Sequence, residues 1–301
     1  MPSVTVGVDA GGTSTIAALA RNGAFVRTHS GPAANASSRG VEAASQTIAA
    51  TILSVLDGAS PDAIAVGAAG AGRDDVARAI ESSLRSRFAL AKITVRDDAS
   101  IALRAAVSDG DGVALIAGTG SIGYAERAGT PFRSGGFGYL LGDEGSGFSI
   151  GQAAVKTLLR AYDGRVPRDA FVVAVERALD VSDAPGALAR MYGDVNPVTA
   201  IASLAPLVLD AANAGERAPT KIVQTAALEL GDLVKAVVRK ADLNGAAVPI
   251  AFAGGLLRRN SILTYLLETR LQNDYPHMPI RKDAVEPYAG ALRAAEHLLH
   301  A

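Results

Sequence analysis

Short apolar runs separated by turn-forming residues open the chain. Valines alternate with polar or small residues over 3–8, which predicts a strand. Two further apolar runs, 16–20 and 25–28, are joined by the turn-forming pair Asn22-Gly23. Between the first two runs lies the segment 9–14, Asp-Ala-Gly-Gly-Thr-Ser, whose glycines are typical of a tight turn. We therefore expect three consecutive antiparallel strands at the start of the fold.

Beyond these strands, helical periodicity alternates with short buried-looking strands. Helices are predicted over 38–56, 74–88, 145–162, 168–179, 198–213, 221–242, 260–273 and 287–300, and another begins after Asp97-Asp98. Strands are predicted at 64–68, 93–95, 113–117, 122–125, 131–133, 248–253 and 279–281. The second half repeats the opening order of strand, glycine-threonine turn and returning strand, although the two halves share negligible sequence identity. This likeness of pattern indicates two related lobes.

The boundary between the lobes is predicted near 105–110. Ser108-Asp109-Gly110-Asp111-Gly112 is a turn-forming cluster at that point. We expect an N-terminal lobe of residues 1–107, joined by the C-terminal helix 288–301, and a C-terminal lobe of residues 108–287. The expected fold class is α/β.

Composition narrows the class of protein. The chain has 301 residues, of which 49% are hydrophobic and 20% are charged, so it can bury a large core. A formal charge of -1 without long runs of like charge argues against nucleic acid as a partner. The N-terminus lacks the pattern of a signal peptide and no window is apolar enough to span a bilayer, so we expect a soluble, cytoplasmic protein without a membrane partner.

Candidate chemistry begins at the two glycine-threonine turns. In Asp9-Ala10-Gly11-Gly12-Thr13, main-chain N–H groups can approach an anion and the threonine adds a hydroxyl donor. The carboxylate of Asp9 is placed to hold Mg²⁺ through water beside a phosphate. Gly118-Thr119-Gly120-Ser121 repeats the arrangement in the second half. Each turn alone could be a hairpin with no ligand, but two of them favour a phosphate-binding function.

Other phosphate and catalytic motifs are missing from the sequence. There is no Gly-x4-Gly-Lys-Ser/Thr, and the glycines between Gly67 and Gly72 have the wrong order for a dinucleotide fingerprint. No Gly-x-Ser-x-Gly elbow indicates a serine hydrolase, and the four histidines lack metal-ligand spacing. The absence of cysteine excludes disulfides, thiolate zinc sites and cysteine-ligated clusters.

Several motifs together resemble a known family, over essentially the whole chain. They are Asp9-x-Gly-Gly-Thr-x-Thr15, Gly118-Thr119-Gly120-Ser121, the segment from Gly135 to Ser146 (Gly-Gly-Phe-Gly-Tyr-Leu-Leu-Gly-Asp-Glu-Gly-Ser) and Ala253-Gly254-Gly255. This set is similar to the ordered motifs of the N-acetylglucosamine kinases and their BadF/BadG relatives. The resemblance implies a two-lobed actin-like ATPase (ribonuclease H-like) fold, with ATP and sugar bound in the interlobe cleft. It also implies a small-molecule sugar substrate and, often, a homodimer.

The resemblance further implies roles for individual residues. Thr13 and Thr119 correspond to ATP contacts, Asp9 lies near Mg²⁺, and Gly254 and Gly255 correspond to the adenosine site. The full set implied for ATP is Gly11, Gly12, Thr13, Gly118, Thr119, Gly120, Ser121, Ala212, Gly254 and Gly255. The set implied for the sugar is Asn35, in a loop beginning at Gly31, together with Gly136, Phe137, Gly138 and Asp143.

Two acidic pairs have competing interpretations. Asp97 and Asp98 follow a predicted strand and precede a helix, so either can cap that helix, and spacing alone does not choose between them. The resemblance favours Asp98 as the general base that takes the proton of the sugar hydroxyl. Asp143 and Glu144 could simply be stabilising at the N-terminus of the following helix, where the helix dipole is positive. The resemblance instead implies that Asp143 contacts the sugar hydroxyls.

The resulting hypothesis is an ATP-dependent kinase that converts N-acetylglucosamine to its 6-phosphate. Glucosamine is the alternative acceptor, followed by N-acetylmuramic acid or glucose. Phe137 and the run Tyr139-Leu140-Leu141 depart from the N-acetylglucosamine kinase pattern, which affects the acetamido pocket. A non-kinase ATPase that acts only as a nucleotide switch is the alternative of another class. The related ATPase activators that carry a cysteine-ligated cluster are excluded, because the chain has no cysteine.

Overall fold

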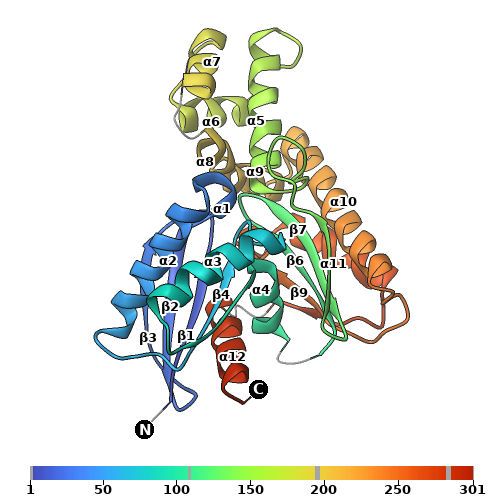
Figure 1. Ribbon diagram of the computed structural model, residues 1–301. Coiled ribbons are helices and arrows are strands. Elements are labelled where there is room, and N and C mark those ends of the chain that lie inside the picture. Colours follow the sequence, from blue (N-terminus) through green and yellow to red (C-terminus); the bar gives the residue numbers. More distant parts are fainter. Residues whose placement is uncertain (1–2, 108–109, 194–196, 283–285, 301) are drawn as a thin grey trace. The chain divides into compact units, whose positions relative to one another are not determined.

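A computed structural model describes residues 3–107, 110–193, 197–282 and 286–300 (Figure 1). The chain forms two compact units. The first unit comprises residues 1–112 together with 283–301, and the second comprises residues 113–282. The position predicted for the lobe boundary, between residues 107 and 108, and the start of its turn-forming cluster, Ser108-Asp109, lie outside the described residues.

The first unit is built on a five-stranded sheet with the order β3-β2-β1-β4-β5. Its strands are β1 (Val4–Ala10), β2 (Ser14–Arg21), β3 (Ala24–Pro32), β4 (Ala63–Ala68) and β5 (Lys92–Asp97). β1, β2 and β3 pair antiparallel, which confirms the three consecutive strands expected from the sequence. β4 and β5 continue the sheet in parallel with β1, so the carboxyl ends of these three strands share one edge.

Helices cover both faces of this sheet. Strand alternation directs Val6 and Val8 into a core with α2 (Val41–Leu56) and α3 (Asp74–Arg87). Gly7, which points to the opposite face, lies against α12 (Pro287–His300). α12 in turn packs against α4 (Asp98–Ala106) (Figure 1).

α12 approaches its neighbours closely enough to require glycine. A Cβ on Gly290 would overlap the carbonyl oxygen of Ile101 and lie 2.6 Å from the main-chain nitrogen of Ala105 in α4. A Cβ on Gly7 would overlap the main-chain nitrogen of Leu292. The guanidinium of Arg293 also donates to the carbonyl oxygens at the end of α4, with Arg104 at 2.7 Å. Main-chain contact without intervening side chains therefore attaches the C-terminal helix to the first sheet.

The second unit repeats the topology of the first. Its five-stranded sheet has the order β10-β9-β6-β7-β8, formed by β6 (Gly112–Ala117), β7 (Ser121–Arg127), β8 (Thr130–Gly135), β9 (Ile250–Ala253) and β10 (Ile280–Arg281). β6 takes the place of β1, because β7 and β8 follow it on one side while the parallel strands β9 and β10 follow on the other. This repeated order confirms the actin-like, ribonuclease H-like fold class.

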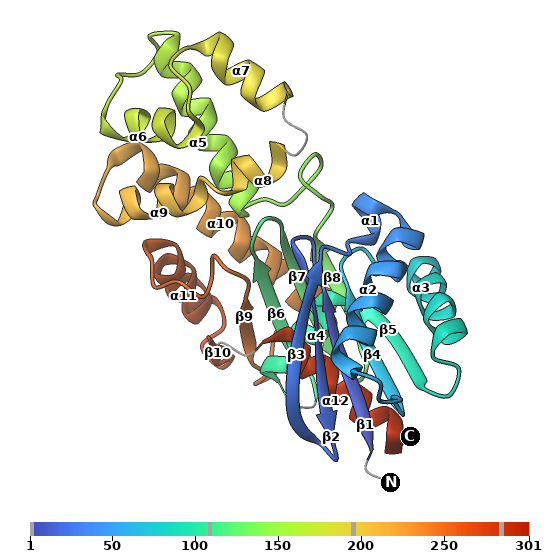
Figure 2. The ribbon, with the colours of Figure 1, turned by 90° about the vertical axis from the view of Figure 1, so that its left-hand side faces the viewer.

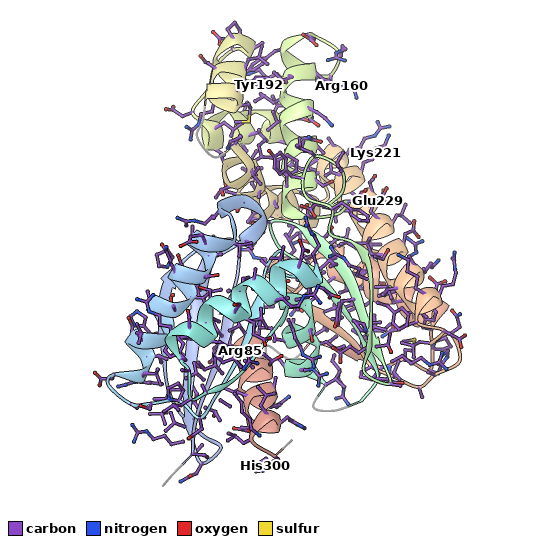
Figure 3. The ribbon with its side chains drawn as sticks, in the orientation of Figure 1. Arg85, Arg160, Tyr192, Lys221, Glu229 and His300 are labelled. Atoms are coloured by element: carbon purple, nitrogen blue, oxygen red, sulfur yellow. The ribbon has the colours of Figure 1, made fainter. Side chains whose placement is uncertain are left out.

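The helices of the second unit form its largest apolar core. They are α5 (Gly147–Tyr162), α6 (Ala170–Leu179), α7 (Ala184–Gly193), α8 (Pro197–Ala202), α9 (Ala205–Asn213), α10 (Arg217–Lys240) and α11 (Ile262–Asp274). α10 crosses the sheet at Gly123, whose missing side chain leaves room for Leu233. α5 to α9 gather beyond one end of the sheet (Figure 2). Figure 3 shows Arg160 of α5 and Tyr192 of α7 at the outer end of this helical group.

Two helix predictions were wrong in detail, and one helix was missed. The predicted helix 38–56 is divided into α1 (Ala36–Arg39) and α2 by Gly40, which has a φ of 82° that favours glycine. The predicted helix 198–213 is divided into α8 and α9, because Pro206 occupies the first turn of a new helix. α7 was not predicted at all.

Among the described residues, no single helix has the length and apolar character needed to cross a membrane. The bent pair of segments Pro197–Asn213 and Arg217–Lys240, at 113° to each other, passes the same test only when taken together and only on length and composition.

The close packing of α12 predicts the effect of adding one methyl group. Gly290→Ala should lower the free energy of unfolding by ~1–3 kcal/mol, because the new Cβ must displace main-chain atoms of α4. Urea denaturation followed by circular dichroism measures the change. Gly193→Ala is the matched control, since it also lies in a helix but has open space around its α-carbon. Equal stability of the two variants would contradict the close approach.

Candidate functional site

The carboxyl ends of the parallel strands bring distant segments of the first unit together. Ala10 of β1, Ala68 of β4 and Asp97 of β5 lie in one row across the sheet. The residues that follow each of them therefore emerge at the same edge. Ala69 donates its N–H to the carbonyl oxygen of Ala10 at 2.9 Å, and this bond holds the end of β4 beside the end of β1. Ligand sites in sheets of this kind lie beyond the carboxyl ends of the strands.

The first glycine-threonine turn connects β1 to β2 at this edge. The N–H of Gly11 donates to the carbonyl oxygen of Ser14 at 2.9 Å and closes the turn. The carbonyl oxygen of Gly11 accepts the N–H of Ala34 at 3.1 Å, so this oxygen is turned toward the protein. Gly12 and Thr13 are exposed at the outside of the turn. The turn thus presents exposed main chain that an anionic group can approach.

Asn35 lies beside the first turn. Its side-chain nitrogen Nδ2 is 3.8 Å from the position that a Cβ on Gly12 would occupy. Gly31 and Pro32, expected in the loop before it, belong instead to the end of β3, and the hydroxyl of Thr15 donates to the carbonyl oxygen of Pro32 at 2.7 Å. The pairing of β2 with β3 therefore places Asn35 beside Gly12, although the two residues are 23 positions apart in the sequence.

The structure distinguishes the roles of the first acidic pair. Asp97 is the N-cap of α4, and its carboxylate accepts the N–H of Ala99 at 2.9 Å. Asp98 is the first helical residue and is half-buried. Burial raises the pKa of Asp98 well above the usual carboxyl range, the charge of Asp97 and a hydrogen bond with it raise this pKa further, and Asp9 contributes in the same direction. Asp9, Asp97 and Asp98 therefore form one acidic group.

The second turn connects β6 to β7 and is bound to a helix. The N–H of Gly118 donates to the carbonyl oxygen of Gly120 at 2.9 Å. The carbonyl oxygens of Gly118 and Thr119 accept the N–H groups of Gly147 and Phe148, at 2.8 and 3.1 Å. The first N–H groups of α5 are therefore used to hold the turn. Thr119 is exposed on the outside, in the same relation to its turn as Thr13.

A glycine-rich loop over residues 135–146 follows β8. Gly136 and Gly138 have φ values of 67° and 83°, which favour glycine. The guanidinium of Arg133 donates to the carbonyl oxygen of Gly136 at 2.9 Å. Phe137 is 68% exposed, and Leu140 and Leu141 are exposed beside it. This loop therefore presents apolar side chains to the outside while polar contacts hold its main chain.

The carboxylate of Asp143 faces the second turn. Its Oδ1 lies 3.4 Å from the N–H nitrogen of Ser121, and its Oδ2 lies 2.8 Å from where a Cβ on Gly120 would be. Burial raises the pKa of Asp143 and the charge of Glu144 adds to this, while hydrogen bonds from the N–H groups of Ser121 and Gly138 oppose it.

The cap of α5 is a residue that the sequence analysis did not select. Ser146 occupies the N-cap position, and its hydroxyl accepts the N–H of Ser149 at 3.2 Å. Asp143 and Glu144 lie before this cap, so neither is needed to cap the helix. A serine immediately before an apolar periodic segment was the available signal.

The residues implied for the adenosine site lie at two different depths. Gly254, with a φ of 89°, packs against the end of β6, where the N–H of Leu256 donates to the carbonyl oxygen of Ala117 at 3.1 Å. Gly255 is exposed beside it. The side chain of Ala212 is only 1% exposed and belongs to the apolar core. The next residue, Asn213, is exposed, and its side-chain oxygen accepts the N–H of Ile262 at 2.9 Å.

The carboxylates of the site suit a Mg²⁺ ion that is held mainly by water and substrate phosphates. In the part of the chain that the structure describes, no group of three His, Asp or Glu side chains forms a complete set of metal ligands. Mg²⁺ is usually bound through one or two carboxylates, water and substrate phosphates. A carboxylate such as Asp9, directly before a turn that can receive a phosphate, fits this mode of binding.

Comparisons with known proteins identify relatives of this chain among sugar kinases. The N-acetylmuramic acid/N-acetylglucosamine kinase of Clostridium acetobutylicum is 34% identical over 219 residues, which is 72% of each chain. The N-acetyl-D-glucosamine kinase of Dictyostelium discoideum is 29% identical over 310 residues and 96% of each chain. A glucosamine kinase of Vibrio cholerae is 31% identical over 204 residues, 64% of this chain and 69% of that one.

Solved structures show the same fold. A candidate N-acetylglucosamine kinase from Chromobacterium violaceum matches with a TM-score of 0.77 and 28% identity, over 96% of this chain and 98% of that one. A glucokinase of the ROK family from Streptomyces griseus, solved with glucose and a nucleotide analogue, matches in fold with a TM-score of 0.64 and 18% identity, over 99% and 100%. The model of the BadF/BadG/BcrA/BcrD ATPase family matches residues 6–297. The chain therefore belongs to the BadF/BadG/BcrA/BcrD ATPase family.

Proposed function

We propose that this chain is an ATP-dependent sugar kinase that phosphorylates an amino sugar, with N-acetylglucosamine as the first acceptor and its 6-phosphate as the product. The observation that carries the proposal is the position of Asp98 at the carboxyl edge of the first sheet. It interacts electrostatically with Asp9, the acidic residue that precedes the first turn, and the N-cap position of α4 is occupied by Asp97. The names of the relatives support the substrate class, and the Vibrio cholerae relative supports glucosamine as the alternative acceptor.

Asp98 is the proposed general base. In the transfer, the acceptor hydroxyl oxygen forms a bond to the γ-phosphorus of ATP, and the bond between that phosphorus and the β–γ bridging oxygen breaks. ADP leaves, and the hydroxyl proton passes to the Asp98 carboxylate. A carboxylate whose pKa is raised by burial has a greater affinity for this proton than one in water.

The glycine-threonine turns are the proposed phosphate sites. Main-chain N–H groups and the hydroxyls of Thr13 and Thr119 suit the phosphate oxygens of ATP, because both threonines are exposed on the outer side of their turns. Asp9 is the residue proposed to hold Mg²⁺ through water, and bound Mg²⁺ supplies positive charge against the β- and γ-phosphates. Gly254, Gly255 and the segment at Ala212 are proposed for the adenosine group.

The proposed acceptor ligands are Asn35, Gly136, Phe137, Gly138 and Asp143. Asn35 can offer both an amide donor and an acceptor to a hydroxyl or an acetamido group. The carboxylate of Asp143 can accept hydrogen bonds from sugar hydroxyls. Exposed Phe137 offers an apolar surface to the C–H groups of a sugar ring.

A panel of acceptors tests the proposed activity. Turnover with ATP and Mg²⁺ should be highest with N-acetylglucosamine, lower with glucosamine, N-acetylmuramic acid and glucose, and should stop when EDTA removes the metal. Sugar phosphate measured by mass spectrometry, alongside ADP, gives the ratio of transfer to hydrolysis. ATP consumption that no sugar changes would support a nucleotide switch and contradict a kinase.

Replacement of the proposed base tests its role. Asp98→Asn should lower kcat by roughly 10²–10⁴-fold, because the amide cannot take the proton of the acceptor. Asp97→Asn is the matched control: asparagine caps helices as well as aspartate does, and the variant removes a neighbouring charge but keeps the proposed base, so its turnover should fall far less than that of Asp98→Asn. Steady-state kinetics and circular dichroism measure turnover and folding. Near-normal turnover of a folded Asp98→Asn variant would overturn the assignment.

The same substitution predicts a change in stability with pH. The pKa of Asp98 is raised in the folded protein, so its ionised form destabilises that state, and this cost grows as pH rises from the ordinary carboxyl pKa through the raised one. Asp98→Asn removes the cost. Its melting temperature in EDTA should exceed that of the wild type at neutral pH, and the difference should shrink toward zero as the pH falls below the ordinary carboxyl range. Scanning fluorimetry across pH measures the difference in melting temperature. An equal difference at all pH values would argue against a raised pKa of Asp98 in the folded protein.

A further inference from the structure

Ser121 holds two consecutive residues of the glycine-rich loop 135–146. Its hydroxyl donates to the carbonyl oxygen of Glu144 at 2.7 Å, and its main-chain N–H is directed at Oδ1 of Asp143 from 3.4 Å. The residue is only 4% exposed and is the first residue of β7, directly after the second glycine-threonine turn. One buried serine thus joins that turn to the loop through its side chain and its main chain.

The loop needs such an attachment at this point. Asp143 has a φ of 60°, in the left-handed region that is unfavourable for a residue with a side chain. Glycines on both sides, Gly142 and Gly145, leave the segment many alternative conformations. The bonds from Ser121 therefore offset the conformational entropy that is lost when the Asp143 carboxylate is fixed.

The packing on the other side of the same carboxylate also depends on the turn. A Cβ on Gly120 would lie 2.8 Å from Oδ2 of Asp143, so only glycine lets the carboxylate come this close. α5 adds a third attachment, since Gly147 and Phe148 donate to the carbonyl oxygens of Gly118 and Thr119. The turn, residues 143–144 and the start of α5 consequently form one hydrogen-bonded assembly within the second unit.

We propose that Ser121 is a positioning residue for the acceptor rather than a ligand of the nucleotide. This inference rests on the proposed function for the identity of Asp143 as an acceptor ligand. The Ser121 hydroxyl is committed to Glu144, and it fixes Asp143 in the orientation that the acceptor meets. Because the phosphate turn and Asp143 share this attachment, binding of the acceptor stabilises the turn, and binding of the nucleotide stabilises the acceptor loop to the same extent.

Ser121→Ala tests the proposal by separating acceptor binding from nucleotide binding. Loss of the hydroxyl leaves the Glu144 carbonyl without this donor, so KM for the sugar should rise roughly 10-fold. The Kd of ATP without sugar should stay within about twofold of the wild-type value. The increase in ATP affinity that sugar causes in the wild type should be lost. Hydrogen exchange followed by mass spectrometry should show faster exchange over residues 136–146.

Ser45→Ala is the matched control. Ser45 is 1% exposed, its hydroxyl donates to the carbonyl oxygen of Val41 at 2.8 Å within α2, and it is not among the residues assigned to binding. The control removes an equally buried serine hydroxyl whose bond stays within one helix, so it should leave KM, ATP affinity and the exchange of residues 136–146 unchanged. A similar effect of both variants would show a general loss of stability and would overturn the proposal.

Other outcomes are equally informative. Weaker ATP binding by Ser121→Ala without sugar, together with an unchanged KM for sugar, would make Ser121 a nucleotide ligand and overturn the proposal. Unchanged exchange of residues 136–146 would overturn it as well. Failure of the wild type to phosphorylate any sugar in the panel would instead overturn the proposed function, because the exchange of the loop and the affinity for ATP are measured without turnover.

Discussion

Parallel pairing of strands is the constraint on which the candidate site depends. Because β4 and β5 run parallel to β1, Ala10, Ala68 and Asp97 share one row, and the segments that follow them meet at one edge. In the second unit, β9 runs parallel to β6, so the Gly254 turn meets the end of β6 at Ala117 in the same way. β2 follows β1 and β7 follows β6 as the neighbouring strand of the same sheet, and the two glycine-threonine turns connect these pairs.

The carboxylates at these edges share a partly buried position. At Gly120, the absence of a Cβ lets the Asp143 carboxylate lie close to the main chain. Such positions are partly removed from water, so burial raises the pKa of both Asp98 and Asp143. Perturbed carboxylates of this kind cost stability, and they are typical of sites that handle protons or polar ligands.

Hydrogen bonds around the second turn distinguish residues that look alike in the sequence. Thr119 and Ser121 both carry hydroxyls in one four-residue motif, yet Thr119 is exposed and Ser121 is buried against the loop 135–146. Asp97 and Asp98 are likewise adjacent and chemically identical, but Asp97 occupies the N-cap position of α4 and Asp98 is its first helical residue. Neighbouring residues with similar side chains therefore have different surroundings and different hydrogen-bond partners.

Local patterns were sufficient for much of the fold. Alternation and turn residues predicted the opening strands, and the repeated strand-turn-strand order indicated two related lobes, because these signals depend on residues close in the sequence. The same reasoning joined 38–56 and 198–213 into single helices, since apolar periodicity continues across Gly40 and Pro206 although the backbone does not. It also missed α7.

Long-range contacts were decided only by the tertiary structure. The sequence by itself determined which residues could carry chemistry: the turns after Asp9 and Ala117, the two acidic pairs and the absence of cysteine. The sequence did not determine three further features. These are the proximity of Asn35 to Gly12, the burial of Ala212 and the hydrogen bond from Ser121 to Glu144 in the loop 135–146. Each depends on strand register and packing between segments far apart in the chain, and side-chain type and spacing carry no information about such distances.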